Sequence, residues 1–407
     1  MLPLSDELKS KWLYGSPLPF AEAPWARGCP SPYYRDSHRR LRHAMRTWVE
    51  THLIPHVHEW EKSESLPHSL YQQAADDGLL MPMASGASIR DAWKGKYPII
   101  GDVPADEWDG FHDLIIHDEF GRVGGIGIEN GLVGGVTLAV PAIERFGTDK
   151  VKQSVVPNIL SGRSRIALAI TEPDAGSDVR GLQTEAKLSE DGSHFIINGQ
   201  KKVLFLPNNL PVDYFLTLVR EETGNFTLLV IARTEGVSTK HMAMSGSTAA
   251  GTAFVDFDDV IVPLDMVVGE RGNGLKYVMS NFNHETVHRI PGIKVCKSMP
   301  RRLDKSLVYQ LSQLSPQESE FLLAGTTAQL KAHAGIVLEH VVREAIQIMG
   351  GVGLTRGGRG ARVERIWRDV KAITVPGGSE EILLDLAAKR ALKISAEMQK
   401  IAVRGRL

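Results

Sequence analysis

The spacing of apolar positions changes twice along the chain. Up to about residue 165, apolar residues recur at intervals of three and four, as in Leu41, Met45, Trp48, Val49 and Leu53. That spacing is typical of helices that bury one face. Short β-branched runs then alternate with turn residues to about residue 268, after which the helical spacing returns. The pattern therefore predicts three domains, over residues 1–165, 166–268 and 269–407.

The middle segment contains three predicted strands with turn signals beside them. Phe195–Ile197 follows Asp191-Gly192, a hairpin signal, and Phe226–Ile231 follows Thr223-Gly224-Asn225. Ala253–Phe257 leads to a stop at Val262-Pro263. We expect an α+β protein in which a compact, barrel-like antiparallel β-domain separates an N-terminal helical domain from a C-terminal helical bundle.

Two further stretches predict helix features. Ser315-Pro316-Gln317-Glu318 combines an N-cap serine, a first-turn proline and a glutamate that can reach back, which predicts a helix running to Met349, where Gly350-Gly351 ends it. The glycine-rich tract Gly124–Gly135 indicates close helix packing or a loop. A phosphate cradle is disfavoured there because no Lys-Ser/Thr pair follows the glycines.

Composition excludes several classes of protein. The chain has 407 residues, 43% hydrophobic and 23% charged, as in soluble globular proteins of two or three domains. A formal net charge of -1 leaves no basic excess for a nucleic acid. Two cysteines, Cys29 and Cys296, cannot build a disulfide framework or a cysteine-based zinc site, which fits a reducing compartment.

The expected location is intracellular. Residues 1–7 lack the basic and apolar regions of a secretory signal, and we expect no membrane span. The C-terminal Gly405-Arg406-Leu407 loosely resembles a peroxisomal address, although an ordinary basic helix end explains it better. Cytoplasm and peroxisome are both consistent with these features, and mitochondria are less favoured.

The most specific stretch runs from Leu168 to Asp178 and reads Leu-Ala-Ile-Thr-Glu-Pro-Asp-Ala-Gly-Ser-Asp. A strand that enters such a turn can present hydroxyls and backbone N–H groups to a phosphate or a flavin edge, although a plain polar turn is the alternative. The stretch resembles the signature of acyl-CoA dehydrogenases. Gln347–Gly353 resembles the family's Gln-x-x-Gly-Gly-x-Gly, and Arg365–Lys371 resembles its arginine-aspartate segment.

The resemblance implies an FAD-dependent oxidoreductase that abstracts an α-proton and transfers a β-hydride from an acyl-CoA to flavin. It implies a homo-oligomer, because the Gln347 segment contacts a neighbouring subunit's flavin in that family, and an electron acceptor that is an electron-transfer flavoprotein or oxygen. The implied FAD contacts are Leu168, Ile170, Thr171, Ser177, Val203, Phe205, Gln347, Gly350, Gly351, Ser379 and Glu381. The implied substrate contacts are Ser177, Asn283, Thr286 and Gly378. Acyl chain length is not readable, and a specialised acyl thioester of secondary metabolism remains open.

The resemblance also bears on the catalytic base, a carboxylate whose burial raises its pKa. Many members carry it after the arginine-aspartate segment, where this chain has Gly377. Others carry it on the first helix of the C-terminal domain, and Asn281-Phe282-Asn283-His284-Glu285 matches that pattern. Glu285 is therefore the predicted base, with a solvated helix carboxylate as the plain alternative. Glu380 is the reserve candidate, although it suits the first turn of a helix.

His284-Glu285-Thr286-Val287-His288 is also a formal H-E-x-x-H, which on a helix would bind zinc with Glu285 as a peptidase base. Pro291-Gly292 breaks the helix soon afterwards, and no third ligand follows at the required spacing. We therefore expect no metal.

Two departures from the family pattern favour a third hypothesis, a non-catalytic or weakly flavin-binding paralogue. No Arg-x-x-Phe-Gly segment follows Glu285, as if about 30 residues, roughly 45 Å of helix, were absent. After Gly199-Gln200-Lys201-Lys202 the chain lacks the family's flavin-facing Trp and Thr, and Phe205 could supply only an aromatic face.

Overall fold

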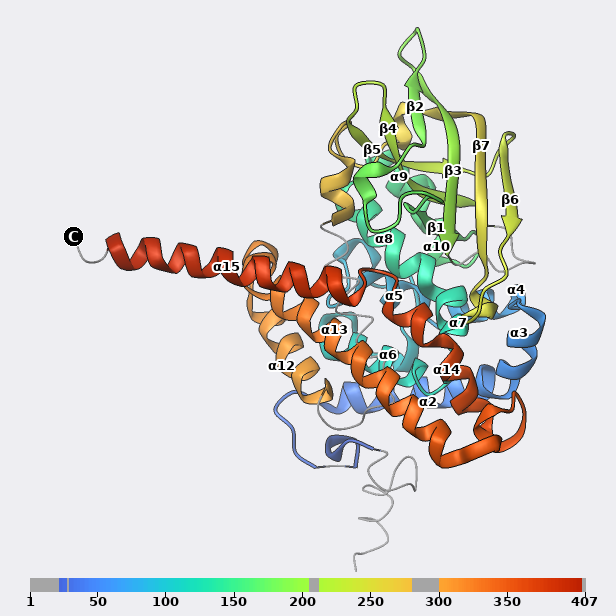
Figure 1. Cartoon of the computed structure of the whole chain (residues 1–407), viewed down its shortest axis with the longest axis vertical. Helices are drawn as coiled ribbons and strands as arrows, with labels where there is room; N and C mark the ends of the chain where they lie inside the picture. Colours follow the sequence, from blue (N-terminus) through green and yellow to red (C-terminus); the bar gives the residue numbers. More distant parts are fainter. Residues whose placement is uncertain (1–21, 28, 205–211, 280–299, 405–407) are drawn as a thin grey trace, which may run out of the picture.

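The computed structural model describes residues 22–27, 29–204, 212–279 and 300–404. A β-domain stands at one end of the molecule, above a larger helical body (Figure 1). The N-terminal helical part contains η1 (Pro24–Arg27), α2 (Asp36–His52), α3 (Val57–Ser63), α4 (His68–Asp76), α5 (Leu80–Ser85), α6 (Gly110–Phe120), α7 (Ile126–Glu129), the π-helical η6 (Asn130–Gly134), α8 (Gly135–Phe146), α9 (Asp149–Ser154) and α10 (Val156–Leu160).

Helix α2 packs against α6 in this part. Its expected apolar face is buried, with Leu41, Met45, Val49 and Leu53 fully inaccessible. The adjacent face carries arginines that join a buried ion network with the segment before η1 and with α6. Arg46 lies 2.8 Å from both Glu22 and Glu119, whose side chains have no solvent-exposed surface. The network thus ties residues 22–27 to two helices.

The β-domain is a single seven-stranded sheet in the order β1-β4-β2-β3-β7-β6, with β5 paired to β4. The strands are β1 (Ile166–Ala169), β2 (Glu185–Leu188), β3 (His194–Leu204), β4 (Tyr214–Glu221), β5 (Phe226–Ala232), β6 (Val237–His241) and β7 (Thr252–Pro263). The β2–β3 hairpin and the stop at Pro263 were predicted. The pairing is mainly antiparallel, as predicted, but β4 pairs in parallel with both β1 and β2.

The glycine-rich tract does provide close packing. A Cβ on Gly135 would lie 1.7 Å from the carbonyl oxygen of Ile166, so only glycine lets α8 approach β1 this closely. Ile126–Phe146 is also apolar and long enough to cross a membrane by length and composition. Because two thirds of its most apolar window is buried and it packs on α5 and β1, it serves as an interior helix.

The C-terminal part contains a helical stretch over residues 274–279 and the helices α12 (Pro300–Gln313), α13 (Pro316–Met349), α14 (Ala361–Thr374) and α15 (Glu380–Arg404). Helix α13 begins and ends as predicted: Ser315 and Glu318 form the capping box, and Gly350 follows Met349 with φ +58°. The short η10 (Gly350–Leu354) links α13 towards α14. Helix α15 projects well beyond the body (Figure 1).

Asp369 of α14 joins all three parts of the chain. Its carboxylate is fully buried and accepts hydrogen bonds from the backbone N–H of Ile126 (2.9 Å), the first residue of α7, and of Ser247 (2.6 Å), in the β6–β7 connection. Neighbouring Arg365 donates to the carbonyl oxygen of Gly124 (2.9 Å). The arginine-aspartate segment therefore acts as a tie between domains in this chain.

Candidate functional site

A buried ion pair supports the turn within the stretch Leu168–Asp178, which we call the signature turn. Lys201 of β3 is fully buried, and its ammonium donates to the carboxylate of Glu172 (2.7 Å) and to the carbonyl oxygen of Ile170 (3.1 Å). Glu172 also accepts bonds from Thr184 and from the backbone N–H of Gln183. Residues on either side of Glu172 are thereby fixed with their side chains outward.

The protein stabilises the negative charge of Glu172 more than the positive charge of Lys201. Burial lowers the pKa of Lys201 to about 8, and the pairing with Glu172 offsets only part of that shift. Burial opposes ionisation of Glu172 as well, but Lys201 and the surrounding donors hold the pKa of this carboxyl below its usual value. The ionised form of Glu172 is the more strongly stabilised of the two charges, because its carboxylate accepts four hydrogen bonds.

The predicted flavin contacts of the β-domain divide into two groups. Thr171 and Ser177 are exposed around the signature turn, as a ligand contact requires, and Leu168 is half-buried. Ile170 and Val203 are buried; Val203 is fully inaccessible and pairs with Ala253 of β7 in the sheet core. The Val203 side chain thus offers no surface to a ligand in this arrangement. Phe205, Asn283, Glu285 and Thr286 lie outside the described residues, as do His284 and His288.

The turn between α14 and α15 carries the other predicted contacts. Gly377 and Gly378 adopt φ of +70° and +102°, in the left-handed region that side chains other than glycine rarely occupy. A carboxylate-bearing residue at 377 would therefore be strained in this conformation. Ser379 follows directly, half-buried, and Glu381 is exposed in the first turn of α15.

Gln347, Gly350 and Gly351 lie far from that turn. All three are exposed, and a Cβ on either glycine would meet nothing within 4 Å, so this backbone is open to an approaching molecule. The junction of α13 and α14 lies at the opposite end of the molecule from the β-domain (Figure 1).

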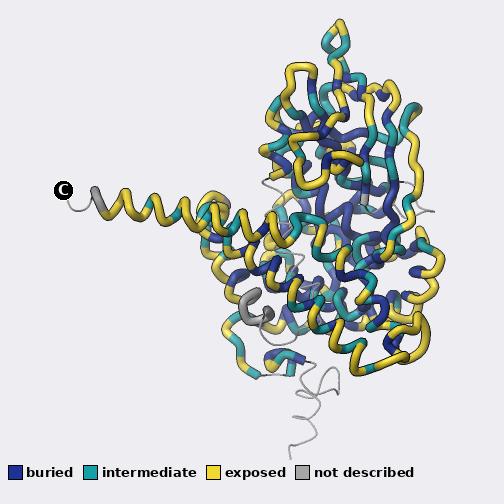
Figure 2. The backbone as a smooth tube through the Cα atoms, in the orientation of Figure 1, coloured by how far each residue is buried: buried dark blue, intermediate teal, exposed yellow. Residues whose placement is uncertain are grey.

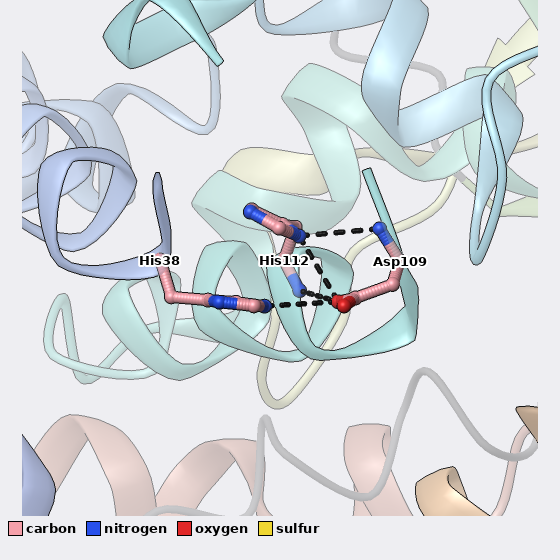
Figure 3. Close-up of side chains that lie close together, drawn as sticks. All are labelled: His38, Asp109 and His112. Carbon is pink, nitrogen blue, oxygen red and sulfur yellow. Dashed lines mark hydrogen bonds and ion pairs between the residues drawn. The ribbon is translucent and has the colours of Figure 1, made fainter. Parts of the chain in front are cut away.

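One cluster in the described part of the chain has the residue types of a metal site. His38, Asp109 and His112 offer ligand atoms within 4.8 Å of one another (Figure 3). Asp109 caps α6 and accepts from His38 Nε2 (2.9 Å), while Arg35 Nη2 lies 3.0 Å from its other oxygen. His38 Nδ1 accepts the backbone N–H of Arg35, and His112 Nδ1 lies 3.1 Å from the backbone nitrogen of Asp109 and 3.0 Å from its carboxylate. Hydrogen bonding occupies these nitrogens, so we assign the cluster to helix capping.

This cluster predicts acid sensitivity. Burial lowers the pKa of His112, and the bond with Asp109 offsets only part of that shift. Burial opposes ionisation of Asp109 too, but hydrogen bonds with His112 and His38 hold the pKa of this carboxyl far below its usual range. Both folded-state pKa values are depressed, so the stabilisation is present above the unfolded values and is lost as pH falls. For His112 that loss begins near pH 6.5.

A His112→Gln variant tests this expectation. Glutamine can still reach back to the N-cap amide at this position but does not titrate. The variant should lose less free energy of unfolding between about pH 7 and pH 5 than the wild type, as measured by urea midpoints. His68→Gln, at an exposed position of α4, is the matched control and should leave the pH dependence unchanged. Equal slopes for His112→Gln and wild type would contradict the assignment.

The described residues also enclose a charged cavity of about 450 Å³ between α3, the connection before η8 (Thr248–Ala250) and α14. None of the predicted flavin contacts lines it. Its walls carry both signs of charge, from His58, Lys62, Glu64, Arg356, Glu364 and Arg368 among others.

Sequence reasoning missed the residues that hold the two turns, Glu172 with Lys201 and, in the α14–α15 turn, Lys331. Lys331 is 4% exposed, and its ammonium donates to the carbonyl oxygens of Pro376 (2.6 Å) and Gly378 (3.2 Å). A signal existed, since Lys331 interrupts the apolar stripe Ala324, Ala328, Ala334 and Leu338 on α13 at helical spacing.

The sequence and the fold are both similar to those of known proteins. Family models for the N-terminal, middle and C-terminal domains of acyl-CoA dehydrogenase match residues 35–95, 167–260 and 301–392. An acyl-CoA dehydrogenase of Emericella nidulans, apdG, is 35% identical over 433 aligned positions, which cover 95% of this chain and 98% of the relative. Because 433 exceeds 407, at least 26 positions of that alignment fall opposite gaps in this chain.

Solved structures agree with the sequence matches. An acyl-CoA dehydrogenase structure from Mycobacterium smegmatis superposes with a TM-score of 0.73 at 26% identity, covering 88% of this chain and 98% of that one. A Bacillus anthracis acyl-CoA dehydrogenase in complex with FAD gives 0.73 at 21% identity, covering 92% and 68%. With a relative above 30% identity over nearly its full length and all three domains matched in order, the chain belongs to the acyl-CoA dehydrogenase family.

Proposed function

We propose that the protein is an FAD-dependent acyl-CoA dehydrogenase that introduces an α,β double bond into an acyl-CoA. The observation that carries the proposal is the signature turn, in which the buried Glu172–Lys201 pair holds Thr171 and Ser177 at the surface. When bound, FAD supplies the hydride-accepting chemistry. The chain's own residues bind and orient the thioester, and Glu285 accepts the α-proton on its carboxylate.

The residues present fit a flavin in part. Thr171 and Ser177 offer hydroxyls beside a glycine, Gly176, where a Cβ would meet nothing within 4 Å, so a ligand can approach the backbone. Ser379 sits at the N-terminus of the long helix α15, a position that suits anionic or polar ligand groups. Val203 is the exception, because it is closed into the sheet core.

Absorbance of the purified protein tests the proposal. A flavin band should be present, or should appear after incubation with excess FAD, and anaerobic addition of a matching acyl-CoA should bleach it. A panel of short, long and branched acyl-CoAs then reports the substrate class. A colourless protein that takes up no FAD would favour the non-catalytic paralogue. Reoxidation of the bleached protein by air, compared with an electron-transfer flavoprotein, distinguishes the two proposed acceptors.

We further propose a homo-oligomer, because one chain leaves large apolar side chains in water. Leu392, Met398 and Ile401 of α15 are 65–71% exposed, on a helix that projects from the body (Figure 2). Ile348 and Leu354, beside the open Gly350-Gly351 backbone, are 86% and 69% exposed. Exposed apolar surface on this scale marks an interaction site.

Light scattering at micromolar concentration should therefore give the mass of a dimer or tetramer. Leu392→Glu with Met398→Glu should shift the mass towards that of one chain, since the substitutions place charges on the covered face. Lys393→Glu, one residue along the same helix, is the matched control for added charge. A single-chain mass for the wild type would contradict the proposal.

A further inference from the structure

A buried lysine from α13 holds the turn that carries Ser379. Lys331 lies in the middle of α13, and its ammonium donates to two carbonyl oxygens that flank Gly377, those of Pro376 (2.6 Å) and Gly378 (3.2 Å). The side chain is 4% exposed. Burial of a charged amine is costly unless hydrogen bonds satisfy it, so its place among the turn's carbonyls is strongly specified.

The surroundings of Lys331 bring the helix and the turn close together. Gly335, one helical turn after Lys331, lies so near α14 that a Cβ there would be 2.9 Å from the side chain of Thr374. The turn itself contains two successive glycines at positive φ, a path that the backbone does not favour without support. Gly378 in turn packs on Leu383 of α15. The conformation between Thr374 and Glu380 therefore depends on contacts made by α13.

We propose that Lys331 is a positioning residue for the flavin: its ammonium fixes the Pro376–Ser379 turn so that Ser379 and the N-terminus of α15 face the cofactor. The proposal rests on the proposed function, since Ser379 is a flavin contact only by the family resemblance. The lysine itself need not touch flavin or substrate. It acts through two carbonyl oxygens of a turn that would otherwise be free to change path.

The test compares FAD affinity with stability in two variants of the same helix. Lys331→Met keeps the apolar stem and removes the donors, and should weaken FAD binding at least about tenfold. Leu338→Ala, at a fully buried core position two turns further along α13, should destabilise the apoprotein by a cavity effect yet leave FAD affinity within about twofold of wild type. FAD dissociation constants and apoprotein melting temperatures are measured below the melting range of all variants.

A second variant changes the backbone of the turn itself and leaves Lys331 in place. Gly378→Ala places a Cβ at φ +102° without touching Lys331, and it should weaken FAD binding as Lys331→Met does. If Lys331→Met fails to fold, Gly378→Ala alone still tests whether the turn conformation controls FAD binding. Lys331→Arg retains a cation with donors and should recover part of the lost affinity.

The outcomes separate the inference from the function. Wild-type protein that binds no FAD overturns the proposed function. Wild-type protein that binds FAD, with unchanged affinity in Lys331→Met and Gly378→Ala, overturns the role of Lys331 and leaves the function intact. Equal losses of affinity in Lys331→Met and Leu338→Ala would also overturn it, because the lysine would then contribute only stability.

Discussion

Glu285→Gln protein is expected to retain flavin while its bleaching by acyl-CoA slows by a factor of about 10² to 10⁴. The amide is nearly isosteric with the carboxylate but cannot accept the α-proton, so the loss falls on the chemical step and not on binding. Stopped-flow absorbance of the flavin band under anaerobic conditions measures this step directly. The FAD dissociation constant, measured in parallel, should be unchanged.

Three companion variants make that experiment decisive. Glu380→Gln removes the reserve carboxylate, exposed in the first turn of α15, and should have little effect on bleaching. His288→Ala should have a mild effect, because the proposed mechanism gives this residue no part in proton abstraction. Under the zinc hypothesis it would be as damaging as Glu285→Gln, since a ligand would be lost. Rapid bleaching of the Glu285→Gln protein would transfer the base to Glu380.

Arg46→Met should lower the free energy of unfolding by about 3–5 kcal/mol. Arg46 donates to both Glu22 and Glu119, two carboxylates without solvent exposure, and removing it leaves them short of a buried cation. Burial works against the charge of Arg46, yet its bonds to Glu119 and Glu22 raise its pKa above the usual value. Arg46 therefore keeps its charge at neutral pH.

Urea unfolding followed by tryptophan fluorescence measures the effect. Trp25 lies beside the network, under the guanidinium of Arg42 (5.1 Å to the ring centre), and reports on it. Arg343→Met is the matched control: this arginine is 65% exposed in its side chain and pairs only at the surface with Glu344, so its loss should cost less than about 1 kcal/mol. Similar losses for the two variants would show that the buried network is not specifically stabilising.

The features that could be predicted from the sequence are those set by neighbours in the chain. The capping box at Ser315 and the glycine stop at Gly350 specify the ends of α13 through contacts within three or four residues. The β2–β3 hairpin likewise follows from a local turn. Each signal was read correctly because the atoms that decide it are close in sequence.

The parts that escaped prediction depend on pairing across long separations. Parallel pairing of β4 with β1 joins residues about 48 positions apart, as in Ile166 with Tyr214, and no local pattern encodes it. In the sequence, Lys331 is only a single charge on an Ala-rich helix. Its role depends on the turn after α14, which lies beside it only in the folded chain. Val203 was predicted to contact the flavin, but its side chain is buried in the sheet core. The alternation of residues along β3 did not predict this burial.

Asp369 has a consequence for how the molecule comes apart. The amide protons of Ile126 and Ser247 are bonded to a carboxylate that belongs to neither of their own domains. When α14 detaches, both amides lose their acceptor together, although more than a hundred residues separate them in the chain. Solvent hydrogen exchange at the two positions should therefore be governed by one shared opening event, the detachment of α14.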